Sequence, residues 1–127
     1  MKIDVSIGEL VDKVTILFIK RKKIKSKQKL NNIVTELMLL QKSMEELGIT
    51  INSTEFKRLE EVNLRLWDIE DKIRIKESKQ EFDDEFIKLA RSVYFENDKR
   101  AEIKREINLK FGSDLIEEKE YVKYSSD

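Results

Sequence analysis

The sequence contains no cysteine and no histidine. These two absences exclude disulfide bonds, thiol nucleophiles, imidazole acid–base catalysis and the usual structural zinc sites, all of which need one residue type or the other. An enzyme of this composition would have to use Asp, Glu, Lys, Arg, Tyr, Ser or Thr. A metal site would hold a hard cation such as magnesium, manganese or calcium on carboxylate oxygens.

Residues that interrupt helices are equally scarce, because the sequence has no proline and only 3 glycines in 127 residues. Charged residues make up 41% of the chain, and this combination is typical of a protein that is helical throughout. The formal net charge is zero. That balance argues against general nucleic-acid binding, which needs an excess of positive charge.

The sequence also lacks any apolar run close to the ~18 residues that a membrane-spanning helix needs. Charged residues at Lys2, Asp4 and Glu9 interrupt the start of the chain, so we expect neither a signal peptide nor a membrane anchor. These features predict a soluble protein located in the cytoplasm.

Apolar residues recur at steps of three and four in four segments of the chain. Their spacing predicts a single domain (1–127) with helices at about 7–26, 28–47, 54–78 and 83–111, and a short acidic C-terminal tail. Ser6 and Glu9 match the capping-box pattern at the first helix, and Gly48 and Gly112 stand where left-handed C-terminal stops are expected. Because the loop before residue 54 is short, we expect an all-α antiparallel four-helix bundle in which the second and third helices form a long central hairpin with coiled-coil-like seams.

The first predicted helix is apolar on nearly every side. Val11, Ile16, Phe18 and Ile19 broaden the stripe that would face a core. Such breadth indicates burial on two sides, either within the bundle or between copies of the chain. We expect a homodimer, since a bundle of this size cannot easily cover the helix by itself.

Lys20–Lys29 carries seven positive charges in ten residues and no negative charge. One interpretation is a solvated helix end, where cations favour the negative end of the helix dipole. The other is a patch for phosphate or for an acidic partner. No aromatic residue lies within the run, as a nucleic-acid platform would require, so we favour the solvated end.

The fourth predicted helix has polar residues in its apolar stripe, where Asn97 and Arg100 interrupt the positions that face the core. In a structural interpretation, Arg100 pairs with a carboxylate from the acidic cluster at Asp68–Asp71 and fixes the register of the bundle. In a functional interpretation, the same residues bind a small anionic ligand or another protein, with an arginine holding a carboxylate or phosphate. The candidates for this polar layer or binding site are Asp68, Glu70, Asp71, Arg74, Arg91, Tyr94, Asn97, Asp98 and Arg100.

Two acidic pairs with a spacing of three residues suggest a different site. Glu9 with Asp12, and Asp68 with Asp71, each place two carboxylates on one helix face. Two such helices side by side could chelate magnesium, an arrangement similar to that of the all-helical nucleotide pyrophosphohydrolases. This alternative predicts a magnesium-dependent phosphohydrolase, whereas the structural interpretation needs no cofactor.

Several longer motifs are more specific than these pairs. They are Ile7–Lys13 (IGELVDK), Leu66–Arg74 (LWDIEDKIR), Ala90–Tyr94 (ARSVY), Asn97–Lys104 (NDKRAEIK) and Gly112–Tyr121 (GSDLIEEKEY). Together they resemble a family of small bacterial and bacteriophage proteins of unknown function, and the resemblance spans nearly the whole chain. It implies a domain that often stands alone and does not supply an activity. The sequence therefore favours a binding or scaffold module that acts as a homo-oligomer, and it leaves open whether the protein is an enzyme.

Overall fold

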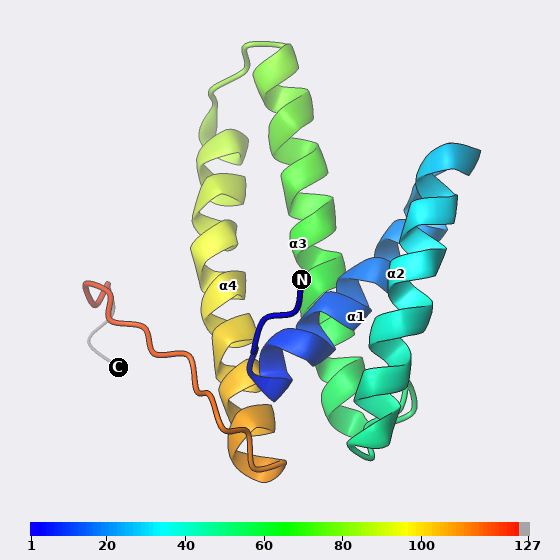
Figure 1. The fold of residues 1–127 in the computed structure, drawn as a ribbon. Coiled ribbons are helices and arrows are strands. Elements are labelled where there is room, and N and C mark those ends of the chain that lie inside the picture. Colours follow the sequence, from blue (N-terminus) through cyan, green and yellow to red (C-terminus); the bar gives the residue numbers. More distant parts are fainter. Residues whose placement is uncertain (125–127) are drawn as a thin grey trace.

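The computed structural model describes residues 1–124 and contains only α-helices as regular structure in that part of the chain. The helices are α1 (Ile7–Lys23), α2 (Lys27–Glu46), α3 (Thr54–Ser78) and α4 (Asp84–Lys110) (Figure 1). The expectation of four helices and an all-α fold is confirmed. None of the helices in the described part combines the length and apolar character needed to cross a membrane.

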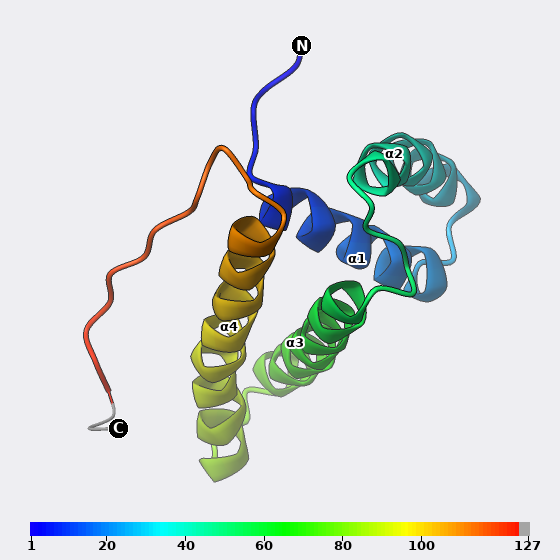
Figure 2. The same ribbon diagram turned by 90° about the horizontal axis from the view of Figure 1, so that it is seen from below.

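Helix α1 is the centre of the fold, because it is in contact with each of the other three helices (Figures 1 and 2). Val11, Val14, Leu17 and Ile19 are all buried, although they point to different sides of the helix. The apolar breadth of this segment is thus explained within one chain. A second copy is not needed to cover α1, so the apolar breadth of this helix is no argument for a homodimer.

The predicted central hairpin between the second and third helices is wrong. Helix α2 packs against α1 alone, and in the described structure it has no close backbone contact with α3. The long antiparallel hairpin is formed by α3 and α4 instead (Figure 1). The connection from α2 to α3 explains the difference. Ile49 of the loop is fully buried, and Phe56 in the first turn of α3 packs edge-to-face on Phe18 of α1, with ring centroids 5.8 Å apart. These contacts place α1 between α2 and α3.

The helix ends largely follow their sequence signals. Gly48 and Gly112 both have positive φ angles, of 83° and 68°, just beyond the ends of α2 and α4, as left-handed stops require. Ser6 caps α1 by accepting a hydrogen bond from the backbone N–H of Glu9 at 3.1 Å. The capping box is only half formed, however, because the Glu9 carboxylate binds Lys104 of α4.

Beyond the level of α1, the hairpin continues as two helices with no third layer (Figure 1). We call this part, residues 69–95, the arm. Its inward-facing side chains are only partly buried, and several large apolar side chains are exposed. The exposed ones are Ile75, Phe82, Ile87, Tyr94 and Phe95. The tightly packed core therefore lies where α1 crosses the hairpin, and the arm projects from it.

The start of α1 approaches the backbone of α4 closely. The backbone N–H of Gly8 donates to Asn108 Oδ1 of α4 at 2.6 Å. A β-carbon at Gly8 would lie 2.5 Å from the carbonyl oxygen of Lys104, a distance that no side chain can keep without moving one of the helices. Glycine at this position lets α1 rest directly on the backbone of α4.

Replacing Gly8 with alanine should therefore destabilise the fold. We expect Gly8→Ala to lower the free energy of unfolding by about 1–3 kcal/mol, as overpacking of a tight contact does. Urea denaturation followed by circular dichroism measures the change. Lys13→Ala, at an exposed position of the same helix, is the control and should shift stability by less than about 0.5 kcal/mol. Equal stability of Gly8→Ala and the wild type would contradict the close approach of α1 to α4.

Candidate functional site

A cleft of about 470 Å³ lies where α1 crosses the α3–α4 hairpin. Its apolar walls come from Ile16 and Ile19 of α1 and from Leu66 and Trp67 of α3. Trp67, the single tryptophan of the chain, is half-buried, so part of its ring faces the cleft. The polar side chains of the lining are Asn63, Glu70, Asp71, Arg74, Asn97 and Arg100.

The polar floor of the cleft is organised by a buried carboxylate, that of Asp12 on α1. Asp12 is 1% exposed, and Arg100 of α4 binds it through two hydrogen bonds, Nε to Oδ1 at 2.9 Å and Nη2 to Oδ2 at 2.5 Å. The hydrogen bond to Asp12 raises the pKa of Arg100 further above its ordinary value, against the opposing effect of burial. The guanidinium of Arg100 is therefore held in its charged form and binds the carboxylate in a fixed bidentate geometry.

Asn63 of α3 completes the network. Its Nδ2 donates to Asp12 Oδ1 at 2.9 Å and to Thr15 Oγ1 at 2.8 Å. Thr15 in turn donates its hydroxyl to the backbone carbonyl of Asp12 at 2.7 Å. Within the described residues, no buried side-chain nitrogen or oxygen is left without a hydrogen-bond partner. The network thus links α1, α3 and α4 without the cost of an unpaired buried polar group.

The expected counter-charge for Arg100 was wrong. We expected the acidic cluster at Asp68–Asp71, whereas the partner is Asp12. The register of the hairpin explains this: Arg65 of α3 pairs with Glu96 of α4 at 2.9 Å, so Arg100 lies level with the first half of α3. The acidic cluster lies more than a turn further along α3, opposite the arm portion of α4.

The nine predicted polar candidates lie in three different places. Five of the nine line the cleft: Glu70, Asp71, Arg74, Asn97 and Arg100. Asp68 is exposed and stands 4.0 Å from Lys23 at the basic end of α1.

The other three candidates lie on a different face of α4. Arg91 donates from Nε to the Tyr94 hydroxyl at 3.4 Å and stacks over Phe95. Asp98 accepts a hydrogen bond from the hydroxyl of Tyr124 in the C-terminal segment. None of these three residues lines the cleft, so the sequence pattern combined two separate surfaces into one.

The four carboxylates of the magnesium alternative do not converge. Asp12 is bound by Arg100, and Glu9 is bound by Lys104 at 2.7 Å. In residues 1–124 no group of three or more acidic side chains is arranged to hold a metal ion. The geometry of the donors therefore does not fit the site that Glu9, Asp12, Asp68 and Asp71 were expected to form.

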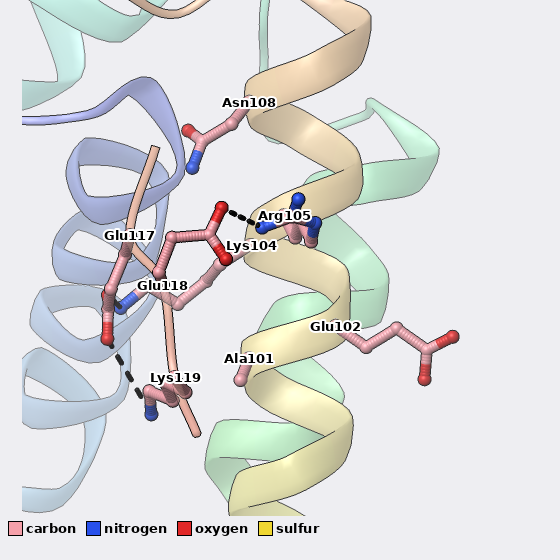
Figure 3. Close-up of a pocket in the computed structure, with 8 residues that line it drawn as sticks. All are labelled: Ala101, Glu102, Lys104, Arg105, Asn108, Glu117, Glu118 and Lys119. Carbon is pink, nitrogen blue, oxygen red and sulfur yellow. Dashed lines mark hydrogen bonds and ion pairs between the residues drawn. The ribbon is translucent and has the colours of Figure 1, made fainter. Parts of the chain in front are cut away.

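Sequence reasoning missed a second cluster, on the side of α4 that faces the C-terminal segment (Figure 3). Lys104 is buried between Glu9 of α1, at 2.7 Å, and Glu117 of the C-terminal segment, at 3.2 Å. Burial alone would lower the pKa of Lys104, but hydrogen bonding to Glu9 and the nearby negative charges raise it above its ordinary value. A lysine at a buried position of α4 was detectable, because Lys104 sits beside Ile103 in the apolar stripe.

The buried network of Asp12, Thr15 and Asn63 was also missed, although the sequence held a signal for it. Asp12 and Thr15 lie three residues apart among the apolar positions of α1, which places two polar side chains on one face of that helix. Asn63 stands between the apolar positions of α3 in the same way. A complete reading of polar residues inside apolar stripes would have found the network.

Removing the Arg100 side chain tests this network. Arg100→Ala should lower the free energy of unfolding by about 3–5 kcal/mol, because it leaves the Asp12 carboxylate buried without its counter-charge. Lys99→Ala, at the neighbouring exposed position, should cost at most about 1 kcal/mol. Urea denaturation of both variants gives the comparison. If Arg100→Ala kept wild-type stability but lost binding of an anionic ligand, the network would be a binding site and not a structural layer.

Comparison with known proteins identifies a family for this chain. The model of a family described as a family of unknown function, DUF6165, matches residues 1–126. No curated protein and no solved structure gave a match. Because the family model covers nearly the whole chain, the resemblance drawn from the motifs is confirmed, and the chain belongs to the DUF6165 family.

Proposed function

We propose that this protein is a binding module and that its ligand occupies the cleft between α1, α3 and α4. The cleft has about 470 Å³ of space, within the range of roughly 300–1,000 Å³ that is usual for small-molecule sites. The observation that carries the proposal is the half-buried Trp67 beside a polar floor that is already fixed. A flat apolar group can lie against its ring, together with Ile19 and Leu66.

The charges of the cleft narrow the class of ligand. Arg100 is bound by Asp12, so it has little capacity left for a ligand. Arg74 is 79% exposed and its contact with Glu70 is loose, at 3.9 Å. It is the guanidinium on the rim that a carboxylate or phosphate can reach. Because Glu70 and Asp71 line the same cleft, the ligand should also carry hydrogen-bond donors or a positive group, and a purely anionic ligand fits less well.

The intrinsic fluorescence of Trp67 provides a direct test, since no other tryptophan contributes to the signal. We expect a saturable change on titration with at least one member of a panel of nucleotides, nucleotide sugars and amino acids. Arg74→Ala should weaken that binding about tenfold or more, because it removes one charge-assisted contact. Arg91→Ala, which removes an exposed arginine outside the cleft, should leave binding unchanged. A panel without any saturable change, or an equal loss in both variants, would contradict the proposal.

We further propose that two copies of the chain associate through the arm. What supports this is the exposure of apolar side chains where the hairpin has no third helix: Phe82 and Ile87 are each 54% exposed. Two helices bury one stripe each against the other and leave the remaining apolar side chains in water. A second hairpin placed against the first would complete a four-helix arrangement of the kind that bundles use.

Light scattering measures this association. The wild type should have a mass near twice that of the 15.2 kDa chain at micromolar concentration, and Ile87→Glu should return it to the monomer by placing a charge in the interface. Val34→Glu, at an exposed position of α2 far from the arm, is the control and should remain dimeric. A wild-type mass of one chain would refute the association.

A further inference from the structure

The C-terminal segment after α4 lies along that helix as an extended chain (Figures 1 and 2). We call residues 114–124 of this segment the strap. Its contacts with α4 are made by side chains: Glu117 pairs with Lys104 at 3.2 Å, and Glu118 pairs with Arg105 at 2.8 Å. In the described structure, no hydrogen bond joins the backbone of the strap to the backbone of α4. From the sequence, this segment was predicted to be a short acidic C-terminal tail.

The surface under the strap is basic and preformed. Lys104 and Arg105 are neighbours on α4 and are held in place by the helix, and Lys104 is fixed from the other side by Glu9 of α1. The hydrogen bond from Lys104, together with its positive charge, holds the pKa of Glu117 below its ordinary value. Two adjacent carboxylates of the strap, Glu117 and Glu118, thus pair with two adjacent cations of α4. The strap and the helix surface are complementary in charge and in spacing.

The strap does not fill this surface. A cavity of about 310 Å³ remains between the strap and α4, with Ala101 and Asn108 on the helix side and Lys119 on the strap side (Figure 3). Further along, Tyr124 packs against Tyr94 and Phe95 with ring centroids 5.1 Å away in each case. The Glu118–Arg105 pair and the Tyr124 ring are exposed, and exposed ion pairs contribute little to stability. Lys104 is buried, but it keeps Glu9 as a partner when Glu117 leaves. The strap is therefore a weakly held occupant of a surface that stays in place without it.

We propose that this face of α4, from Tyr94 to Asn108, is a docking groove for an acidic, extended protein segment. The strap is its resident occupant, and an incoming segment with the same chemistry replaces it. The groove recognises two consecutive carboxylates through Lys104 and Arg105, and an aromatic side chain through Tyr94 and Phe95. Tyr94 and Asp98, which the cleft does not use, contact Tyr124 of the strap and belong to this second surface.

A labelled peptide with the sequence of the strap, DLIEEKEYVKY, tests the groove on the full-length protein by fluorescence anisotropy. The wild type should bind the peptide weakly, because its own strap competes. Glu117→Gln/Glu118→Gln loosens the resident strap and should bind the peptide at least tenfold more tightly. Adding Arg105→Glu to this double variant should abolish the gain in peptide affinity. Arg58→Glu is the matched control. It reverses the charge of a similarly exposed arginine on another face and should leave the gain in peptide affinity intact.

The outcomes separate this proposal from others. Equal peptide binding by the wild type and the double variant, or no binding by either, would refute an exchangeable occupant. Binding that survives Arg105→Glu would place the peptide elsewhere on the molecule. A peptide in which both adjacent glutamates are replaced by glutamine should bind at least tenfold more weakly, and equal binding would show that the carboxylates are not recognised. The fluorescence of Trp67 in the cleft should not respond to the peptide. The proposal for the groove and the proposal for the cleft are therefore tested independently.

Discussion

The buried ion pair between Asp12 and Arg100 is the constraint on which the rest of the fold depends. A carboxylate with 1% exposure is tolerated only if a counter-charge and hydrogen bonds replace the water that it has lost. Arg100 supplies the charge from α4, and Asn63 supplies a further donor from α3. The three helices must therefore meet at one level and in one register. Apolar packing alone, which tolerates sliding and rotation, would not impose that condition.

Helix α4 consequently presents different chemistry on two sides. Toward α1 and α3, Arg100 and Asn97 contribute to the floor of a cleft whose polar groups are largely satisfied by each other. Toward the C-terminal segment, Lys104 and Arg105 form a basic surface that the strap neutralises. Glu9 connects the two sides, since it lies one turn before Asp12 on α1 and binds Lys104. A binding event at either surface would thus act on a helix that the same charged groups hold in place.

Local features of this fold could be predicted from the sequence, because they depend on near neighbours in the chain. Helical periodicity and the stops at Gly48 and Gly112 are of this kind. The pairing of helices was not predictable in the same way. A short loop after α2 favoured a hairpin with α3, but Ile49 is buried in the core and Phe56 packs on Phe18 of α1 instead. The partner of Arg100 was missed for a related reason: carboxylates were abundant, and only the three-dimensional register selected Asp12.

A double-mutant cycle at Asp12 and Arg100 tests the central claim most directly. In the wild type, Asp12→Asn should lower the free energy of unfolding, because it removes the charge that Arg100 binds. In the Arg100→Ala background the same change should raise it, because it removes a buried carboxylate without a counter-charge. The account predicts this change of sign and a coupling free energy of about 2–3 kcal/mol. An equal cost of Asp12→Asn in both backgrounds would show that the two residues do not stabilise the fold together, and would contradict the account.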